Sequence, residues 1–496
     1  MPGEPKSIWM ATTVSLVRPS ITANQSFDVV VVGAGIAGIY TAYRLKKAGL
    51  KVAILEAGTI ISDVTGNTTG KLTSQHGLRY AKLEKIFGPE AARTYGEANE
   101  WALSEVAALS DSESLECDLI SNPAHVFTTE EGREDEFASE LDACLKAGLP
   151  ASIPTSLDLP FQIKSAIRFD RQYRFHPRKF LLGLASGLQI FENSRVLEIS
   201  EKDDHCELVT DQGVVRANSV VVATNYPIFD SNFFLAKLSP YRSYALALEV
   251  EGDIPEGMFV SEGEILRSMR RQAVDGKDLL IVGGEDHKAG QEENTEQCFL
   301  RLEEWARENF NVREVRFRWS AQDNSTPDGL PYIGRASGTK QIYVATGFDG
   351  WGMSNGIVAG KLIADLIEGK ADEAWEKLFS PSRIEFEAVP TMIKENLNVA
   401  GHLIGDRIRR IARHETDSLA NGEAAIVQLD DKRIGAFRDD TGSLHLVSTA
   451  CTHMGCQLAW NGAERSWDCP CHGSRFDVDG RVLHSPAVKA LETFPV

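Results

Sequence analysis

Several features that would place this 496-residue chain in a membrane, outside the cell or on a nucleic acid are missing from its sequence. No run approaches about eighteen consecutive apolar residues, so we expect no membrane-spanning segment. Residues 1–26 lack the basic start and apolar core of a secretion signal, and we expect them to form a loose tail. A net charge of −19 disfavours binding to nucleic-acid phosphates.

Cysteine is also scarce, with eight in the whole chain, which is too few for a disulfide scaffold and fits a cytoplasmic protein. Four of the eight stand alone, and we expect them to be buried packing residues. These four are Cys117, Cys144, Cys206 and Cys298. The other four lie in two short boxes near the end of the chain.

The two boxes read Cys451-Thr452-His453-Met454-Gly455-Cys456 and Cys469-Pro470-Cys471-His472-Gly473-Ser474. Their Cys-x-His and Cys-x2-His spacings suit a [2Fe–2S] cluster in which two thiolates bind one iron and two imidazoles bind the other. Zinc also accepts mixed cysteine and histidine ligands and is the alternative. Zinc sites, however, more often pair cysteine with cysteine and histidine with histidine, whereas each box here carries both types.

The boxes resemble those of Rieske proteins of the cytochrome bc type. The resemblance implies four cluster ligands, Cys451, His453, Cys469 and His472, and a disulfide between Cys456 and Cys471 that ties the two cluster loops together. In a reducing compartment such a disulfide needs burial or a low potential to persist. Ring-hydroxylating oxygenases usually lack this second cysteine pair, and we find no Asp/Glu-x2-His-x4-5-His pattern for mononuclear iron. The resemblance therefore favours an electron carrier.

Two further residues in this region are informative. Ser474 matches a serine that hydrogen-bonds a cluster sulfide in Rieske proteins. Quinol-oxidising members usually have tyrosine at the position of Phe476. Because a lost hydroxyl donor leaves the reduced cluster less stabilised, we predict a reduction potential below theirs.

The amino-terminal region carries the pattern of a dinucleotide site. A β-branched run, Val29–Val32, leads into Gly33-Ala34-Gly35-Ile36-Ala37-Gly38, and a helix and a second strand ending at Glu56 follow. The glycines permit a tight turn and close approach to a pyrophosphate, and an acid about twenty residues later can take ribose hydroxyls. The predicted contacts are Gly33, Gly35, Ile36, Ala37, Gly38, Glu56 and Ala57. The fingerprint alone leaves FAD and NAD open.

Later segments indicate FAD. The blocks Thr326–Gly334 and Ile342–Gly356, followed by a helix to about Leu366, resemble the closing flavin-binding segment of the D-amino-acid oxidase superfamily. Glycine oxidase, sarcosine oxidase and γ-glutamylputrescine oxidase belong to that group. The resemblance covers roughly Phe27–Glu368.

This resemblance implies further contacts with FAD. The diphosphate and ribityl chain would lie against Thr65, Thr68, Thr69, Gly70 and Lys71, and the adenine near Val196. Thr224 and Gly347 follow buried strands, and Gly350, Trp351, Gly352 and Met353 would face the pyrimidine end of the flavin.

The predicted fold is an α/β Rossmann-type FAD-binding domain with an inserted α+β substrate domain, followed by an all-β Rieske domain. The expected segments are a tail at 1–26, FAD-binding parts at 27–76, 164–228 and 320–369, substrate parts at 77–163 and 229–319, a helical linker at 370–418 and the Rieske domain at 419–496. Because the chain has no second GxGxxG motif, we expect electrons from an organic substrate rather than from a nicotinamide.

Three residues are candidates for catalysis. Amino-acid-oxidising relatives commonly place an arginine where this chain has Asp323, and an acid suits a cationic amine, although a surface-loop role is equally consistent. Trp351 is expected to wall the substrate pocket. His76 is a candidate base, but a structural histidine is the favoured interpretation.

The linker contains apolar residues at near-helical spacing beside four arginines. They are Met392, Ile393, Leu397, Leu403, Ile404, Ile408 and Ile411, with Arg407, Arg409, Arg410 and Arg413. Such a helix can lie on a membrane surface, but packing against the flavin domain is favoured.

Together these features predict a flavoenzyme that oxidises a small amine or amino acid by hydride transfer to flavin N5. Its electrons would pass singly to the fused cluster and on to an external acceptor, either a protein or a quinone. Two alternatives stay open: an amine oxidase that uses O2 and has an accessory cluster, and a non-catalytic flavin and iron–sulfur relay or redox sensor.

Overall fold

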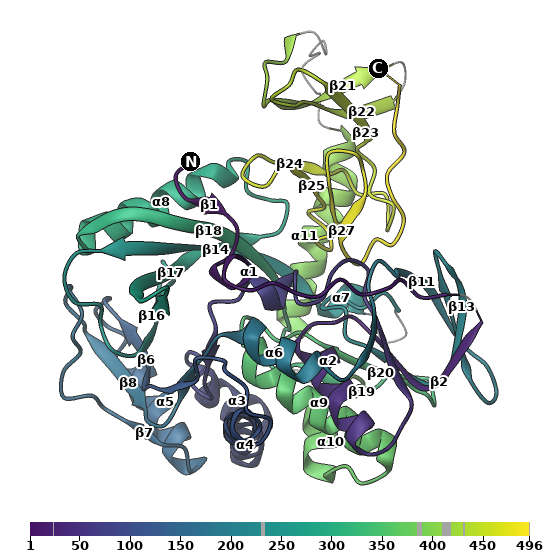
Figure 1. Cartoon of the computed structure of the whole chain (residues 1–496). Helices are drawn as coiled ribbons and strands as arrows, with labels where there is room; N and C mark the ends of the chain where they lie inside the picture. The colour runs from purple at the N-terminus through teal and green to yellow at the C-terminus, as the bar shows by residue number, and fades with distance from the viewer. Residues whose placement is uncertain (23, 230–233, 384–388, 409–417, 430–431, 496) are drawn as a thin grey trace.

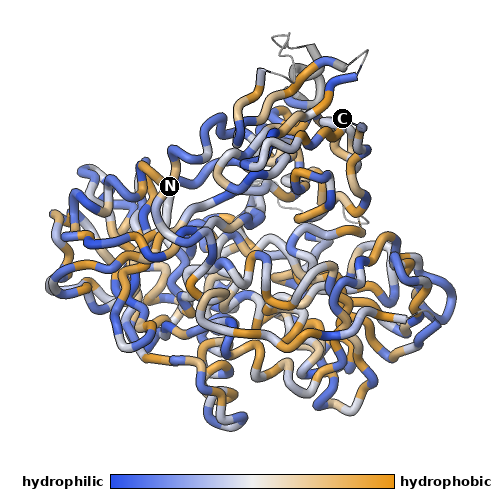
Figure 2. The backbone as a smooth tube through the Cα atoms, turned by 45° about the horizontal axis from the view of Figure 1, so that its top comes forward, coloured by the Kyte–Doolittle hydropathy of each residue, from blue (hydrophilic) through white to orange (hydrophobic). Residues whose placement is uncertain are grey.

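The computed structural model describes residues 1–22, 24–229, 234–383, 389–408, 418–429 and 432–495. A large body carries two packed domains, and a smaller β-domain stands on top of it (Figure 1). Helix α11 (Val389–Ile408) runs between the body and this smaller domain. Hydrophobic segments run through the interior of the body, while hydrophilic segments form its outer loops (Figure 2).

The first domain is built on an eight-stranded sheet that begins with the predicted glycine-rich unit. Strands β10, β3, β2, β13 and β20 are parallel, and β13 is long enough to pair with β12 over its first half and with β20 at its end. The strands are β2 (Gln25–Val32), β3 (Val52–Leu55), β10 (Gln189–Phe191), β11 (Val196–Glu201), β12 (Cys206–Thr210), β13 (Gly213–Val222), β19 (Tyr332–Arg335) and β20 (Ile342–Thr346).

Two helices, α2 (Ile36–Lys47) and α9 (Gly352–Glu368), pack together against this sheet. Their close approach requires glycine, since an added Cβ at Gly360 would lie 2.5 Å from Cδ1 of Tyr40. Helix α6 (Pro177–Ala185) and the short α7 (Phe234–Lys237) complete this domain, and a small sheet joins β4 (Lys71–Leu72), β5 (Ile120–Ser121) and β9 (Tyr173–Arg174).

The second domain is a nine-stranded, mostly antiparallel sheet with helices at its side. Its strands are β1 (Glu4–Pro5), β6 (Ala124–Thr128), β7 (Ala151–Ser152), β8 (Ser165–Phe169), β14 (Ser239–Val250), β15 (Met258–Ser261), β16 (Arg267–Val274), β17 (Lys277–Lys288) and β18 (Val312–Ser325). Its helices are α3 (Arg79–Phe87), α4 (Pro89–Ser112), α5 (Glu134–Lys146) and α8 (Thr295–Asn309). Strand β8 lies within the segment 164–228 that was predicted for the FAD-binding domain, and β18 crosses the boundary predicted at 319, because strand patterns do not reveal which sheet a strand joins.

The expectation of a loose amino-terminal tail is wrong for the first residues. Strand β1 pairs with β18, and helix α1 (Ile8–Ala11) buries Ile8 and Trp9 completely. Trp9 Nε1 donates to the carbonyl of Thr68 at 2.5 Å. The segment therefore supports the predicted flavin loop, through contacts that join distant parts of the sequence.

The carboxy-terminal domain is all β. One sheet contains β21 (Ala424–Leu429), β22 (Lys432–Arg438) and β23 (Leu444–Ser448), and the other contains β24 (Ala459–Asn461), β25 (Ser466–Asp468), β26 (Arg475–Phe476) and β27 (Val482–His484). Trp467, Phe476 and the four box cysteines lie in its core. The four solitary cysteines elsewhere are buried, as predicted.

The linker forms α10 (Glu373–Phe379) and α11. Over its described side chains α11 packs between the domains: Glu395 accepts from Ser239 and Lys288, and Val399 joins the core of the β-domain. Ile393 and Leu397 are 55% and 67% exposed. Of the residues predicted to line an amphipathic face, Arg409, Arg410, Ile411 and Arg413 lie outside the described residues. None of the helices in the described ranges combines the length and apolar character needed to cross a membrane.

Candidate functional site

A cavity of about 1610 Å³ lies where the two sheets of the body meet the β-domain. Its wall contains the glycine-rich turn after β2, the loop at 61–71, the turn at 348–353 and the facing strands of the nine-stranded sheet. This volume exceeds that of most small-ligand pockets, which hold roughly 300–1,000 Å³. The cavity can therefore hold a dinucleotide together with a small substrate.

The glycine-rich turn has the geometry that a pyrophosphate needs. Gly33 has φ +103°, and an added Cβ would lie 2.4 Å from the carbonyl oxygen of Ala223. Gly35 is the N-cap of α2, so the positive end of the helix opens on the cavity. Gly38 does not line the cavity. Its role is close helix–strand packing, because an added Cβ would lie 2.0 Å from the Gly33 carbonyl oxygen.

Glu56 lines the cavity at the end of β3, beside Ala57. Its carboxylate accepts hydrogen bonds from the backbone N–H groups of Ala34 at 2.8 Å and Gly58 at 2.9 Å. Burial raises the pKa of this carboxyl, and the two N–H donors oppose the rise. The acid thus supports the glycine turn in addition to the ribose contact predicted for it.

The loop at 65–71 presents hydroxyls to the same space. Thr65 Oγ1 accepts from the N–H of Ile36, which places this oxygen at the start of α2. Thr68, Thr69 and Lys71 line the cavity. Burial, with Arg270 nearby, lowers the pKa of Lys71 to about 7. Gly70 faces away from the cavity, where a Cβ would lie 3.0 Å from Trp9.

Of the remaining predicted cofactor residues, six line the cavity and one does not. Val196, Thr224, Gly350, Trp351, Gly352 and Met353 line the cavity. Gly347 does not: it has φ +75°, and an added Cβ would lie 2.4 Å from Thr326 Cγ2. We assign Gly347 to the turn between β20 and the cavity-lining residues 348–353 rather than to a cofactor contact.

His76 is a structural residue. Its Nδ1 lies 2.7 Å from Tyr95 Oη, and its Nε2 lies 2.8 Å from the Thr73 carbonyl and 3.1 Å from Ser354 Oγ. Burial lowers the pKa of His76 to about 3, so the ring is neutral. It stacks on Trp351 with ring centroids 4.6 Å apart. With both nitrogens engaged, His76 can position Trp351 but has no nitrogen left to serve as the candidate base.

Asp323 lies near the end of β18 and lines the cavity, so the surface-loop interpretation is wrong. Its carboxylate accepts from the N–H groups of Gly350 at 2.7 Å and Asn324 at 2.8 Å. Burial raises its pKa to about 6. Asp323 therefore holds the turn at 348–353 and also exposes a titratable acid to the cavity.

The two Cys–His boxes meet in the β-domain. The rings of His453 and His472 lie 5.1 Å apart at 87°, and Cys451 and Cys469 are free, buried thiols. The Cys469 thiol and the Ser474 hydroxyl hydrogen-bond to Cys451, and this lowers its pKa to about 7. No described residue gives the buried Nδ1 of His472 a hydrogen-bond partner. Two thiols and two imidazoles fit a [2Fe–2S] cluster.

Cys456 and Cys471 form a disulfide with an S–S distance of 2.17 Å. The Cys469 sulfur lies within 4.8 Å of both disulfide sulfurs. Since disulfide sulfurs are not thiolates, these two residues clamp the loops instead of joining the ligand set.

Residues 28–366 match the DAO family, which is described as FAD dependent oxidoreductase. The chain belongs to this family. Residues 410–495 match the Rieske [2Fe-2S] domain, which decides between the iron–sulfur and zinc interpretations of the two boxes. The superfamily resemblance and the fold class predicted from the sequence are thereby confirmed.

Three known proteins illustrate the similarity. A Bacillus subtilis (strain 168) protein named as a Rieske 2Fe-2S iron-sulfur protein, YhfW, is 34% identical over 497 residues, which cover 98% of this chain and 97% of that protein. Gamma-glutamylputrescine oxidoreductase of Escherichia coli (strain K12) is 25% identical over 393 residues, covering 74% and 90%. Glycine oxidase from Geobacillus kaustophilus has the same fold, with a TM-score of 0.62 at 19% identity over 73% of this chain and 100% of that chain.

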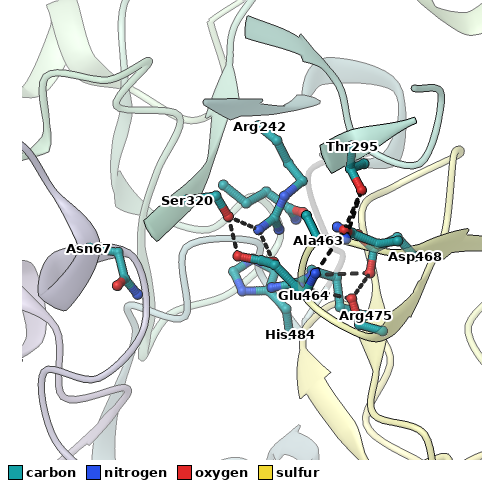
Figure 3. A network of polar contacts seen from close by, with 12 residues as sticks. Asn67, Arg242, Thr295, Ser320, Ala463, Glu464, Asp468, Arg475 and His484 are labelled. Atoms are coloured by element: carbon teal, nitrogen blue, oxygen red, sulfur yellow. Dashed lines mark hydrogen bonds and ion pairs between the residues drawn. The ribbon is translucent and has the colours of Figure 1, made fainter. Parts of the chain in front are cut away.

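A buried ion network joins the Rieske domain to the FAD-dependent oxidoreductase body (Figure 3). Arg242 and Ser320, from β14 and β18, contact Glu464 of the Rieske domain. Glu464 also pairs with Arg475, whose Nε donates to Asp468 at 3.0 Å. The Arg242 side chain is 1% exposed and that of Glu464 22%. Its two arginines overcome the effect of burial and keep the pKa of Glu464 below its usual value.

The Rieske domain also forms part of the cavity wall, which no sequence motif indicated. Its contribution includes Arg475, Arg481, Val482, His484 and Ser485. Ser485 Oγ donates to the carbonyls of Thr224 and Tyr226 at 3.1 and 3.0 Å. The expected flavin site and the cluster domain are thus in direct contact.

The second domain and the turn at 348–353 contribute charged cavity residues that the sequence did not single out. Burial raises the pKa of Asp286 to about 6, and Arg79 pairs with Asp349 at 2.8 Å. Arg267 pairs with Glu285 at 2.6 Å. Arg79, Arg267 and Asp286 belong to no motif of the sequence, and their place in the cavity wall depends on the fold.

Proposed function

We propose that this protein is an FAD-dependent dehydrogenase that oxidises a small amine or amino acid and passes the electrons through its Rieske cluster to an external acceptor. The observation that carries the proposal is the shared wall: residues of the Rieske domain line the cavity that also holds the glycine turn of the FAD site. FAD supplies the conversion between hydride transfer and single-electron transfer when it is bound.

The cavity residues act by binding and positioning. Gly33, Gly35 and the start of α2 cradle the diphosphate, and Trp351 walls the space beside the flavin-facing turn. Ionised Asp323 and Asp286 favour a substrate with a positively charged nitrogen. Loss of a hydride from the substrate carbon and a proton from its nitrogen would leave an imine.

The two histidine ligands of the expected cluster differ in their surroundings: one faces the FAD-binding domain and the other lies nearer to solvent. His472 is 3% exposed and faces Tyr226 of the FAD-binding domain. His453 is half-buried, and the next residue, Met454, is 47% exposed. Electrons would enter on the His472 side and leave on the His453 side, where an acceptor protein or a quinone can approach. The buried solitary cysteines fit the cytoplasmic setting expected from the sequence.

An anaerobic substrate screen tests this function. Polyamines, other small amines and amino acids are added to the full-length protein under argon. We expect flavin bleaching followed by the electron paramagnetic resonance signal of the reduced cluster. Stoichiometric peroxide in air with an idle cluster would indicate the oxidase alternative, and reduction only by a protein donor would indicate the relay.

A second experiment tests where FAD binds. Gly35 has φ −84°, and aspartate is a favourable N-cap. An added Cβ would lie 3.1 Å from Thr65 Oγ1, so Gly35→Asp should preserve the fold after a shift of a few tenths of an ångström in that side chain. Its carboxylate would repel the diphosphate at the start of α2. We expect apoprotein stability to be maintained and FAD affinity to fall at least a hundredfold. Unchanged FAD affinity would contradict the placement.

A further inference from the structure

One histidine of the Rieske domain is directed at the cavity without a complete set of partners. His484, at the end of β27, is 3% exposed and lines the cavity. Its Nδ1 lies 2.7 Å from Oδ2 of Asp63, which comes directly before η1 (Val64–Asn67) of the FAD-binding domain. Asp63 lines the cavity as well. The pair therefore bridges the two domains at the cofactor space.

The second ring nitrogen of His484 has no such contact. Within the described ranges, no residue offers a hydrogen-bond partner to the buried Nε2. A buried polar atom left without a partner is destabilising, so nearly all such atoms find one. Because Nδ1 is directed at Asp63, Nε2 is available to a molecule in the cavity.

The surroundings indicate which part of FAD would meet this nitrogen. Two residues after Asp63, Thr65 accepts from the N–H of Ile36 at the start of α2, where the diphosphate is expected. On the same Rieske strand, the carbonyl of Val482 accepts from Arg195 at 2.9 Å. His484 thus lies between the diphosphate loop and the strand expected near the adenine.

We propose that His484 is an FAD-binding residue supplied by the Rieske domain. Asp63 orients the imidazole through Nδ1, and Nε2 contacts a diphosphate oxygen or a hydroxyl of FAD. The ring accepts from a hydroxyl when neutral and donates to a diphosphate oxygen when protonated. The inference rests on the proposed placement of FAD in the cavity.

This contact would couple FAD binding to docking of the Rieske domain. A ligand that touches both domains stabilises the docked arrangement, and the docked arrangement in turn tightens binding. FAD then serves as part of the interface, and its loss should loosen the attachment of the cluster domain.

The test uses full-length apoprotein titrated with FAD and followed by flavin fluorescence. The variant is His484→Asn, because an asparagine amide can keep the Nδ1-type donor to Asp63 while it lacks Nε2. We expect about a tenfold to hundredfold loss of FAD affinity. The cluster's visible circular dichroism and the melting temperature of the apoprotein should match those of the wild type.

The matched control is His445→Asn. His445 lies in the same domain and also directs Nδ1 at an aspartate, Asp479, at 2.8 Å, but it is outside the cavity wall. We expect His445→Asn to bind FAD with wild-type affinity.

Equal losses of FAD affinity in His484→Asn and His445→Asn, or a loss of less than twofold in His484→Asn, would overturn the proposal. If Gly35→Asp loses FAD while His484→Asn retains it, the placement stands and the role of His484 falls. If both variants retain FAD, the placement itself is wrong.

Discussion

The imidazole of His472 meets the phenol ring of Tyr226 edge to face, with ring centroids 6.2 Å apart. Tyr226 is 1% exposed and follows Thr224 and Asn225, which line the cavity. Its own carbonyl accepts from Ser485 of the Rieske domain. The expected cluster and the expected flavin are therefore separated by one short, packed stretch of chain.

We predict that Tyr226→Leu slows internal electron transfer, because it removes the ring packed against His472 and opens a gap in the route. Cluster reduction after anaerobic flavin reduction should become at least tenfold slower by stopped flow. Tyr226→Phe is the control, since it keeps the ring and loses a 3.3 Å hydrogen bond to the Phe234 carbonyl. If all three proteins reduce the cluster at one rate, the route runs elsewhere.

The buried network predicts that Glu464→Gln weakens docking of the Rieske domain. Removing this charge leaves Arg242 and Arg475 without their shared carboxylate, and breaking a buried pair costs about 3–5 kcal/mol. We expect faster limited proteolysis of the α11 linker and a lower melting temperature. Glu492→Gln is the control. Its pair with Lys432 is about 60% exposed, and its loss should have little effect.

The sequence was sufficient to predict the features that depend on local pattern. The turn at Gly33–Gly38 needs residues without a Cβ, and the two Cys–His boxes carry their ligand types within a few residues. Both could be identified without the fold. His76 lies in the cavity wall, and its hydrogen bonds to Tyr95 and Thr73 agree with the structural interpretation that the sequence favoured over a base.

Features that depend on contacts between distant residues could not be predicted. Arg242 and Glu464 are 222 residues apart, and Asp63 and His484 are 421 apart. Helix α1 spans four residues, too few to be stable alone, and it forms because Trp9 packs against the loop at 65–71. Each of these contacts forms only after distant segments have packed together. A single sequence shows helix and strand periodicity, but not which distant residues will meet.

Phe476 lies fully buried in β26, opposite Trp467. We predict that Phe476→Tyr raises the reduction potential of the cluster, because a hydroxyl donor to a ligand sulfur favours the reduced, more negative state. The shift is about 60 mV for each 1.4 kcal/mol of added stabilisation. Phe437→Tyr, buried in the other Rieske sheet, is the control for redox titration. An unchanged potential in Phe476→Tyr would contradict the explanation.

Asp323 predicts a stability change between about pH 4 and pH 6. Burial raises its folded-state pKa to about 6, so the folded protein holds a proton that the unfolded chain has released. Its contribution to stability is complete below about pH 4 and is lost as the pH rises through 6. Relative to Asp323→Asn, wild-type apoprotein should therefore lose on the order of 2 kcal/mol between pH 4 and pH 7 in denaturant unfolding. The exposed Asp440 provides the control, Asp440→Asn, which should track the wild type at every pH.

Because ionised Asp323 is also the acid proposed to attract a cationic amine, kcat/KM for such a substrate should rise through the same pH range and lose this rise in Asp323→Asn. A pH-dependent rise that survives the substitution would assign the titration to another group, with Asp286 as the next candidate.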